Sequence, residues 1–143
     1  MSVKQISVFL ENKPGALLGM TRVLAEQNID MRAFSLAETS DFGIARIIVN
    51  DVAKTTAVLQ EAGFVHNVTP VIAVAVSNTP GGLNRALTAL SEASVNVEYM
   101  YAFVGGREES AYMIFRVADN EKAAAALHAA GIRLAEQEEI ATL

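Results

Sequence analysis

The sequence predicts an α+β protein made of two tandem copies of one small βαββαβ sandwich, because it repeats itself and each repeat alternates between strand and helix patterns. The segment ISVFLENKPGALLGMTRVLAEQNIDM begins at Ile6, and it recurs as IAVAVSNTPGGLNRALTALSEASVNV from Ile72. Two long copies favour paired small domains, since a solenoid needs at least about three stacked repeats. We therefore expect one domain over residues 1–70 and a second over residues 71–143.

The repeated residues align the two copies almost without gaps. Pro14 recurs as Pro80, 66 residues later, and Gly63 recurs as Gly131, 68 residues later. The second copy therefore carries two additional residues, which we place in the polar stretch 105–109.

Each copy begins with a strand and a helix. From Ile6 to Leu10 the apolar pattern has a period of two, which predicts a strand with one better-buried face. From Leu17 to Leu24 apolar residues follow spacings of three and four, which predicts a helix with one buried stripe. We expect this helix to start at Pro14, and its counterpart at Pro80, because proline suits the first helical turn.

A hairpin and a second helix complete each copy. In the first copy, strands at 29–36 and 44–49 flank a turn near Asp41. The second helix begins after Asp51 and ends at Gly63. A closing strand gives the order of a ferredoxin-like sandwich. We therefore expect two tandem ferredoxin-like βαββαβ sandwiches, packed side by side, each an antiparallel sheet with its helices on one face.

Three local features refine this expectation. Asn28 and Ser94 follow the first helix of each copy, and Asn tolerates the left-handed conformation that commonly closes a helix. The first strand of the second hairpin is expected to begin at Val95. Residues 65–76 must close the first sheet and open the second, with only Pro70 between them.

Composition and motifs exclude several classes of function. The net charge is −5 and the 11 Lys and Arg residues are scattered, whereas phosphate binding needs a clustered basic face. There is no Cys and no apolar run of the roughly 18 residues that cross a membrane. No P-loop, dinucleotide, G-x-S-x-G or H-E-x-x-H motif appears. We expect a cytoplasmic protein that is not an enzyme, without cofactor or metal, and without nucleic-acid or membrane partners.

The loop before each first helix is the candidate ligand site. These loops are ENKPGAL, Glu11 to Leu17, and SNTPGGL, Ser77 to Leu83. The first-turn N–H groups of a helix lack internal partners, and the helix dipole adds positive charge there, so a carboxylate is favoured. The same residues also make an efficient loop and helix start, so a purely structural role stays open.

The side chains around these loops suit a zwitterionic ligand. Gly15 and Gly81 carry nothing that would block a ligand from the backbone. The Asn12 amide offers a donor and an acceptor, and Asp30, at the start of the next strand, suits an ammonium group.

The pattern of strand, Asn-x-Pro-Gly-x-Leu and helix, followed by QNIDM from Gln27 and ASVNV from Ala93, resembles the ACT domain, a small regulatory module that binds amino acids. Over its whole length the chain most closely resembles stand-alone bacterial proteins made of two tandem ACT domains. The resemblance implies modules paired side by side, with a small amino acid at their interface, and we expect a homodimer. Contacts would come from the loop before the first helix of one module and the second-strand region of its neighbour.

The resemblance nominates nine ligand-binding residues in each copy. In the first copy they are Asn12, Lys13, Pro14, Gly15, Ala16, Leu17, Asn28, Ile29 and Asp30. In the second copy they are Asn78, Thr79, Pro80, Gly81, Gly82, Leu83, Ser94, Val95 and Asn96.

The chain departs from the usual family residues at several of these positions. Asn12 and Asn78 stand where the family often has Asp, and Asn28 and Ser94 stand where it often has Gly. Asp30 replaces the usual Asn. The contact with the amino group of a ligand is therefore less well specified than the backbone contacts.

Three functions are compatible with these residues. The leading hypothesis is a non-catalytic sensor in which a bound amino acid alters association of the chain with itself or with a metabolic enzyme. The alternative is an obligate regulatory subunit of an amino-acid biosynthetic enzyme, since the chain also resembles the small subunit of acetolactate synthase. A self-contained enzyme is the weakest alternative, because no set of acid, base and nucleophile is visible.

Overall fold

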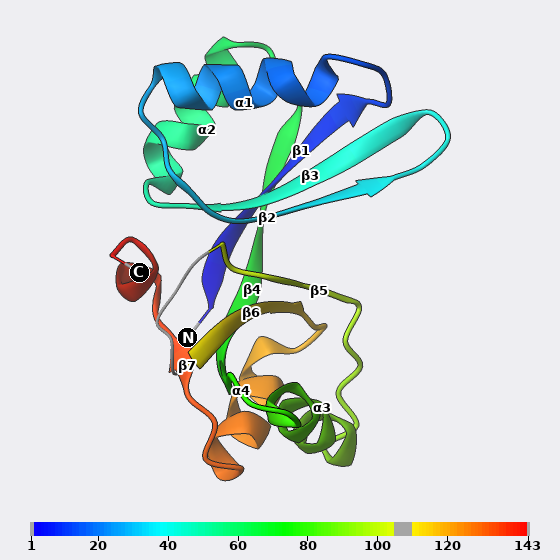
Figure 1. Ribbon diagram of the computed structural model, residues 1–143, viewed down its shortest axis with the longest axis vertical. Helices are drawn as coiled ribbons and strands as arrows, with labels where there is room; N and C mark the ends of the chain where they lie inside the picture. Colours follow the sequence, from blue (N-terminus) through cyan, green and yellow to red (C-terminus); the bar gives the residue numbers. More distant parts are fainter. Residues whose placement is uncertain (1, 105–109, 143) are drawn as a thin grey trace. The chain divides into compact units, whose positions relative to one another are not determined.

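A computed structural model describes residues 2–104 and 110–142, which form two compact units (Figure 1). The first module comprises Lys4–Thr69. The second module comprises the described residues from Pro70 onward, with Ser2 and Val3. The stretch 105–109, where the two additional residues were placed, lies outside the described residues.

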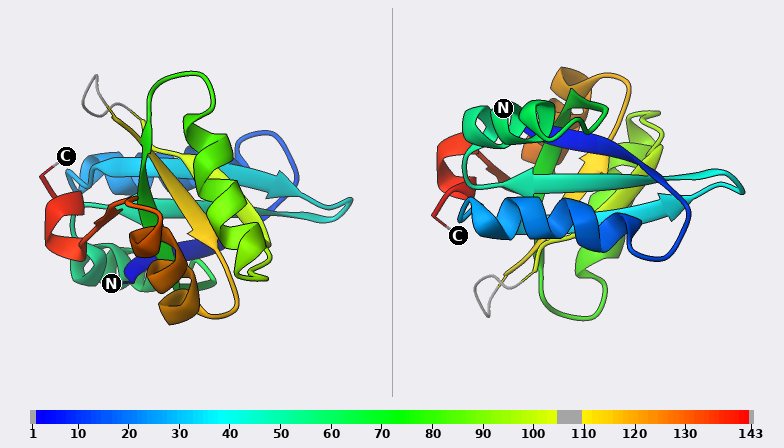
Figure 2. Two further views of the ribbon diagram at one scale, coloured as in Figure 1. Left: turned by 90° about the horizontal axis from the view of Figure 1, so that it is seen from below. Right: turned by 90° about the horizontal axis from the view of Figure 1, so that it is seen from above.

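The first module is an antiparallel sheet with two helices on one face, as the sequence predicts. Its elements are β1 (Val3–Glu11), α1 (Ala16–Glu26), β2 (Met31–Glu38), β3 (Phe42–Val49), α2 (Val52–Glu61) and the beginning of β4 (His66–Ser77). The strand order is β2-β3-β1-β4, and β3 pairs antiparallel with both β1 and β2. The right-hand view of Figure 2 shows α1 and α2 on the same side of these strands.

The second module repeats this arrangement. Its elements are the remainder of β4, then α3 (Gly82–Glu92), β5 (Tyr99–Ala102), β6 (Ser110–Arg116), α4 (Asn120–Ala129), β7 (Leu134–Ala135) and a short helix α5 (Gln137–Ile140). The strand order β5-β6-β4-β7 matches that of the first module. The left-hand view of Figure 2 shows α3 and α4 on one side of the sheet. The sequence did not predict α5.

The central strand pair has the same register in both modules. In the first, Ile6 pairs with Ile47, and at the equivalent positions of the second, Ile72 pairs with Phe115. Residues of β1 in one module therefore correspond to residues of β4 in the other, 66 positions later. This shared register makes it possible to compare the two modules position by position.

Each module has its own hydrophobic core between the helices and the sheet. The first core is formed by Ile6, Val8, Leu10, Met20, Leu24, Ile29, Ala45, Ile47, Val49 and Leu59. The second core is formed by Ile72, Val74, Val76, Ala86, Leu90, Phe115, Val117, Ala123, Ala124, Leu127, Ile132 and Leu134. These are mainly the residues that the strand and helix periodicities place on one face.

The helices α1 and α3 begin two residues later than predicted. Gly15 and Gly81 precede them with φ of 86° each, a left-handed conformation that cannot belong to a right-handed helix. Pro14 and Pro80 therefore lie in the turn that leads to the helix, and the prediction that the helices start at these prolines is wrong.

The residues that the sequence placed at the ends of α1 and α3 and at the starts of α2 and α4 are found there. Asn28 and Ser94 are left-handed, with φ of 55° and 57°. The Asp51 side chain accepts a hydrogen bond of 3.0 Å from the Lys54 backbone N–H and so caps α2. Asp119 caps α4 in the same way.

One strand agrees with the prediction for residues 65–76, and another differs from its prediction. β4 runs through Pro70 without interruption, so one strand closes the first sheet and opens the second. β5 begins at Tyr99 rather than at Val95, and it is only four residues long. Among the described residues, no helix combines the length and the apolar character needed to cross a membrane.

Gly82 is required by close packing at the start of α3. A methyl group added at this position would collide with the carbonyl oxygen of Ser77, at the end of β4. The equivalent residue of the first module is Ala16, so the first loop leaves room for a side chain. The two loops therefore share a sequence pattern but not the same packing.

Substitution Gly82→Ala should destabilise the second module, because the Ser77 carbonyl must move or the helix start must shift. We expect the free energy of unfolding to fall by about 1–3 kcal/mol, as for other overpacked sites. Chemical denaturation followed by circular dichroism measures this change. The control is Ala16→Gly, which removes a methyl group from the first loop and should cost about 1 kcal/mol or less. Equal stability of G82A and the unmodified protein would contradict the packing described here.

Candidate functional site

The loop between β1 and α1 is held by backbone and side-chain contacts with the β2–β3 turn. The Asn12 side-chain amide donates a 3.1 Å hydrogen bond to the Thr39 carbonyl oxygen. The Asn12 backbone N–H donates to the Asp41 carbonyl oxygen at 3.5 Å. Asn12 thus has a structural role that the sequence did not reveal, because its partner lies 27 residues away.

The first turn of α1 presents free N–H groups. Ala16 N–H donates to the Lys13 carbonyl oxygen at 3.3 Å, and Gly19 N–H makes the first helical bond, with Gly15. Within the described part of the chain, the N–H groups of Leu17 and Leu18 have no acceptor. An anion at this helix start would satisfy both.

The equivalent turn of α3 has the same backbone pattern. Gly82 N–H donates to the Thr79 carbonyl oxygen at 3.0 Å, and the N–H groups of Leu83 and Asn84 have no acceptor among the residues that the structure describes. The Thr79 hydroxyl lies 2.8 Å from that of Ser77.

The charged side chains near the nominated residues are paired. Lys13 forms a 2.9 Å ion pair with Glu11 at the protein surface. The Asp30 carboxylate lies 3.2 Å from the Arg32 guanidinium, and the Asp30 backbone N–H donates to the Asn50 side chain. Because Arg32 already compensates the charge of Asp30, this carboxylate offers less attraction to a ligand ammonium group than the sequence suggested.

The structure does not bring the two nominated groups of one module together. Asn12 to Leu17 lie at the start of α1, whereas Asn28 to Asp30 lie beyond its end. The helix contains 11 residues and therefore separates the groups by roughly 16 Å. The same separation applies across α3, which also has 11 residues. A small ligand cannot contact both groups of one module, so a shared site would require residues from two modules.

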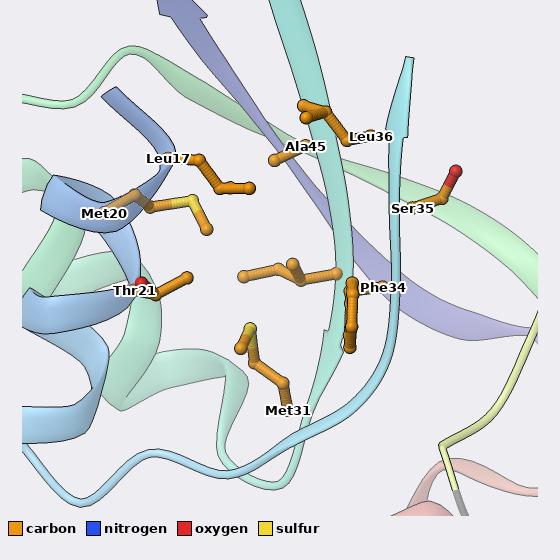
Figure 3. Close-up of a pocket in the computed structure, with 9 residues that line it drawn as sticks. Leu17, Met20, Thr21, Met31, Phe34, Ser35, Leu36 and Ala45 are labelled. Atoms are coloured by element: carbon orange, nitrogen blue, oxygen red, sulfur yellow. The ribbon is translucent and has the colours of Figure 1, made fainter. Parts of the chain in front are cut away.

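An apolar cavity of about 280 Å³ lies between α1 and the β2–β3 hairpin of the first module. Its lining residues are Leu17, Met20, Thr21, Met31, Phe34, Ser35, Leu36, Ala45 and Ile47. In Figure 3, Leu17, Met20 and Thr21 project from α1 towards the hairpin, and Phe34 and Leu36 lie on β2. Of these nine residues, only Leu17 had been nominated from the sequence.

The cavity exists because α1 leaves the edge strand β2 partly uncovered. Phe34 pairs with Ile47, which pairs with the core residue Ile6, so the Phe34 side chain faces the helices. Phe34 and Leu36 are nevertheless 55% and 51% exposed. The sequence signal that could have revealed the cavity is the small residue Ala45 on the central strand, opposite this uncovered edge.

A charged cluster around Arg133 serves the structure of the second module. Arg133 donates hydrogen bonds to Glu139, at 2.9 Å, and to the Tyr112 hydroxyl, at 2.7 Å. The hydrogen bond to Glu139 raises the pKa of Arg133 above its ordinary value. His66 lies 2.9 Å from the Phe64 carbonyl oxygen, and the described residues contain no group of three or more acidic or histidine ligands suited to a metal.

Comparison with known proteins agrees with this architecture. The family profile described as an ACT domain pair matches residues 1–143. No curated protein matches the sequence. The structure of protein BT0572 from Bacteroides thetaiotaomicron is 36% identical, with a TM-score of 0.92, and the match covers 100% of this chain and 98% of that chain.

More distant structures show that the fold is shared with regulatory proteins. The ligand-free regulatory subunit of aspartate kinase from Thermus thermophilus is 18% identical, with a TM-score of 0.65, over 89% of this chain and 91% of that chain. The same subunit from Thermus flavus is 19% identical, with a TM-score of 0.61, over 90% and 92%. The profile match, which spans both modules, shows that the chain belongs to the ACT domain family as an ACT domain pair.

Proposed function

We propose that this ACT domain pair is a non-catalytic regulatory protein that binds a small free amino acid where ACT modules meet. The observation that carries the proposal is the pair of equivalent helix starts, each with two free N–H groups next to a left-handed glycine. The carboxylate group, which all amino acids share, would bind these N–H groups. The nominated residues of the two modules that meet would supply the remaining contacts.

The separation of the nominated groups supports a site built from two modules. The helix-start loop of one module would hold the carboxylate, and residues equivalent to Asn28, Ile29 and Asp30 of a neighbouring module would approach from the other side. Ligand binding would then change how modules associate, which is the basis of an allosteric response.

The exposed edge of the first module supports self-association. β2 is the edge strand of its sheet, and Phe34 and Leu36 are half exposed on it. Leu17 and Leu18 on α1 and Phe42 on β3 add further exposed apolar surface to this module. Unpaired edge strands and apolar patches favour association, and we propose a homodimer in the cytoplasm.

A second candidate function is that of a regulatory subunit that acts on a metabolic enzyme. The names of the Thermus structures describe regulatory subunits of aspartate kinase, and the apolar edge of the first module would suit an enzyme partner as well as a second copy. In that case the essential contact is with a protein, and the ligand site forms with the partner.

Thermal unfolding against each of the twenty amino acids should show stabilisation by one chemical class. A ligand at 100 times its Kd adds about 2.7 kcal/mol of apparent stability, because it binds only the folded state. Differential scanning fluorimetry of the purified protein measures the shift. If none of the twenty shifts the midpoint, free amino-acid binding by the isolated protein is excluded and the regulatory-subunit function is favoured.

The carboxylate contact is tested with ligand analogues, because substitution of Gly15 would strain a backbone with positive φ. The amine that remains when the effective amino acid is decarboxylated should produce no shift at the same concentration. The deaminated acid should retain partial binding. An amine that stabilises the protein as well as its parent amino acid would show that the helix-start N–H groups are not the anchor.

The oligomeric state separates the two candidate functions. Light scattering coupled to size-exclusion chromatography should give a homodimer for the purified protein. Co-purification of a larger chain at fixed stoichiometry, with a monomer after its removal, would instead identify an enzyme subunit as the physiological partner.

A further inference from the structure

We propose that the apolar cavity of the first module is the pocket for the ligand side chain, so that the protein selects amino acids with an apolar side chain and binds one of them per chain. This inference rests on the proposed function and adds the chemical class of the ligand and the module that recognises it. It is carried by the composition, size and position of the cavity, and by a difference between the two modules.

The lining offers no free polar group. Its two polar residues are Thr21 and Ser35. The Thr21 hydroxyl donates to the Leu18 carbonyl oxygen at 3.1 Å, and Figure 3 shows its methyl group directed towards the cavity. The Ser35 hydroxyl points away from the cavity in the same view. A polar side chain placed here would lose its hydrogen bonds with water and gain none, whereas an apolar one would be stabilised by burial.

The size of the cavity suits one side chain of a small ligand. Its volume of about 280 Å³ lies just below the range of roughly 300–1,000 Å³ that is usual for pockets that hold a whole ligand. The two methionines of the lining, Met20 and Met31, are flexible and can adapt to side chains of different shape. Leucine, isoleucine, valine and methionine are therefore the expected ligand class.

The cavity adjoins the start of α1 through a single residue. Leu17 contributes its side chain to the cavity lining, and its backbone N–H is one of the two free groups in the first turn of α1. An amino acid with its carboxylate at this turn would therefore have its side chain beside the cavity. The two parts of the site are complementary to the two ends of one apolar amino acid.

In the second module, larger side chains stand at the positions that border the cavity in the first module. The shared register places Met113 and Phe115 where the first module has Ala45 and Ile47. Phe115 is fully buried in the second core, and Met113 packs against it. Leu87 likewise stands where the first module has Thr21, and it also packs against the core. In the second module these larger side chains therefore occupy the space that stays open as a cavity in the first module.

Substitution Ala45→Met gives the first module the side chain that the second module has at this position. We expect A45M to bind apolar amino acids at least about tenfold more weakly, or not at all, while the protein remains folded. The matched control is Met113→Ala in the second module, which should leave the affinity of the first site unchanged. Thr21→Leu fills the cavity from the helix side, and it provides an independent variant if A45M fails to fold.

Isothermal titration calorimetry of the full-length protein should use pairs of ligands that differ mainly in polarity. The pairs are leucine with asparagine, methionine with glutamine, and valine with threonine. Where a pair shows binding, its apolar member should bind at least about tenfold more tightly than its polar member. The reason is that burial of an unpaired amide or hydroxyl is unfavourable. The stoichiometry should be one ligand per chain.

The possible outcomes separate this inference from the proposed function. If no amino acid binds, both the proposed function and this inference fail. If amino acids bind but polar and apolar members have equal affinity, or A45M and T21L bind as tightly as the unmodified protein, the cavity is not the side-chain pocket although the proposed function stands. Two equivalent ligands per chain, or an A45M effect confined to dimerisation, would also overturn the assignment.

Discussion

The antiparallel pairing of β1 with β3 is the interaction on which the rest of the first module depends. It places Ile6 opposite Ile47, and Val8 opposite Ala45, which together form the surface that the helices cover. The same register brings the end of β1 beside the start of β3, so that the loop before α1 lies where Asn12 can bond the hairpin turn. A slip of one residue would turn the apolar face outward and separate these contacts.

Local chemistry made most of the fold predictable from the sequence. Periodicity identified the strands and helices, and Asn28 and Asp51 marked a helix end and a helix start correctly, because each acts on the backbone within a few residues. The predicted starts of α1 and α3 were wrong, because adjacent residues there favour different backbone conformations. Pro14 is a suitable first helical residue, but the left-handed Gly15 that follows it delays the helix.

The candidate site was less predictable than the fold, since it depends on contacts between distant residues. The sequence identified the helix-start loops, but it gave no indication that Asn12 bonds Thr39 or that Arg32 pairs with Asp30. The cavity was missed for the same reason. It arises because one small residue, Ala45, lies opposite an edge strand that α1 leaves partly uncovered, and these elements are separated in the sequence.

The two modules share the backbone of the loop before the first helix but differ in the side chains of the sheet. In the proposed function, the helix-start N–H groups bind the carboxylate that all amino acids share, and a left-handed glycine precedes the helix in both copies. In the same proposal, selectivity depends on the side chains of the sheet, which can change without altering the loop. A module whose sheet carries Ala45 leaves apolar surface exposed, whereas one that carries Met113 covers its own core. The proposed ligand selection therefore belongs to the first copy, because the second copy covers its own core.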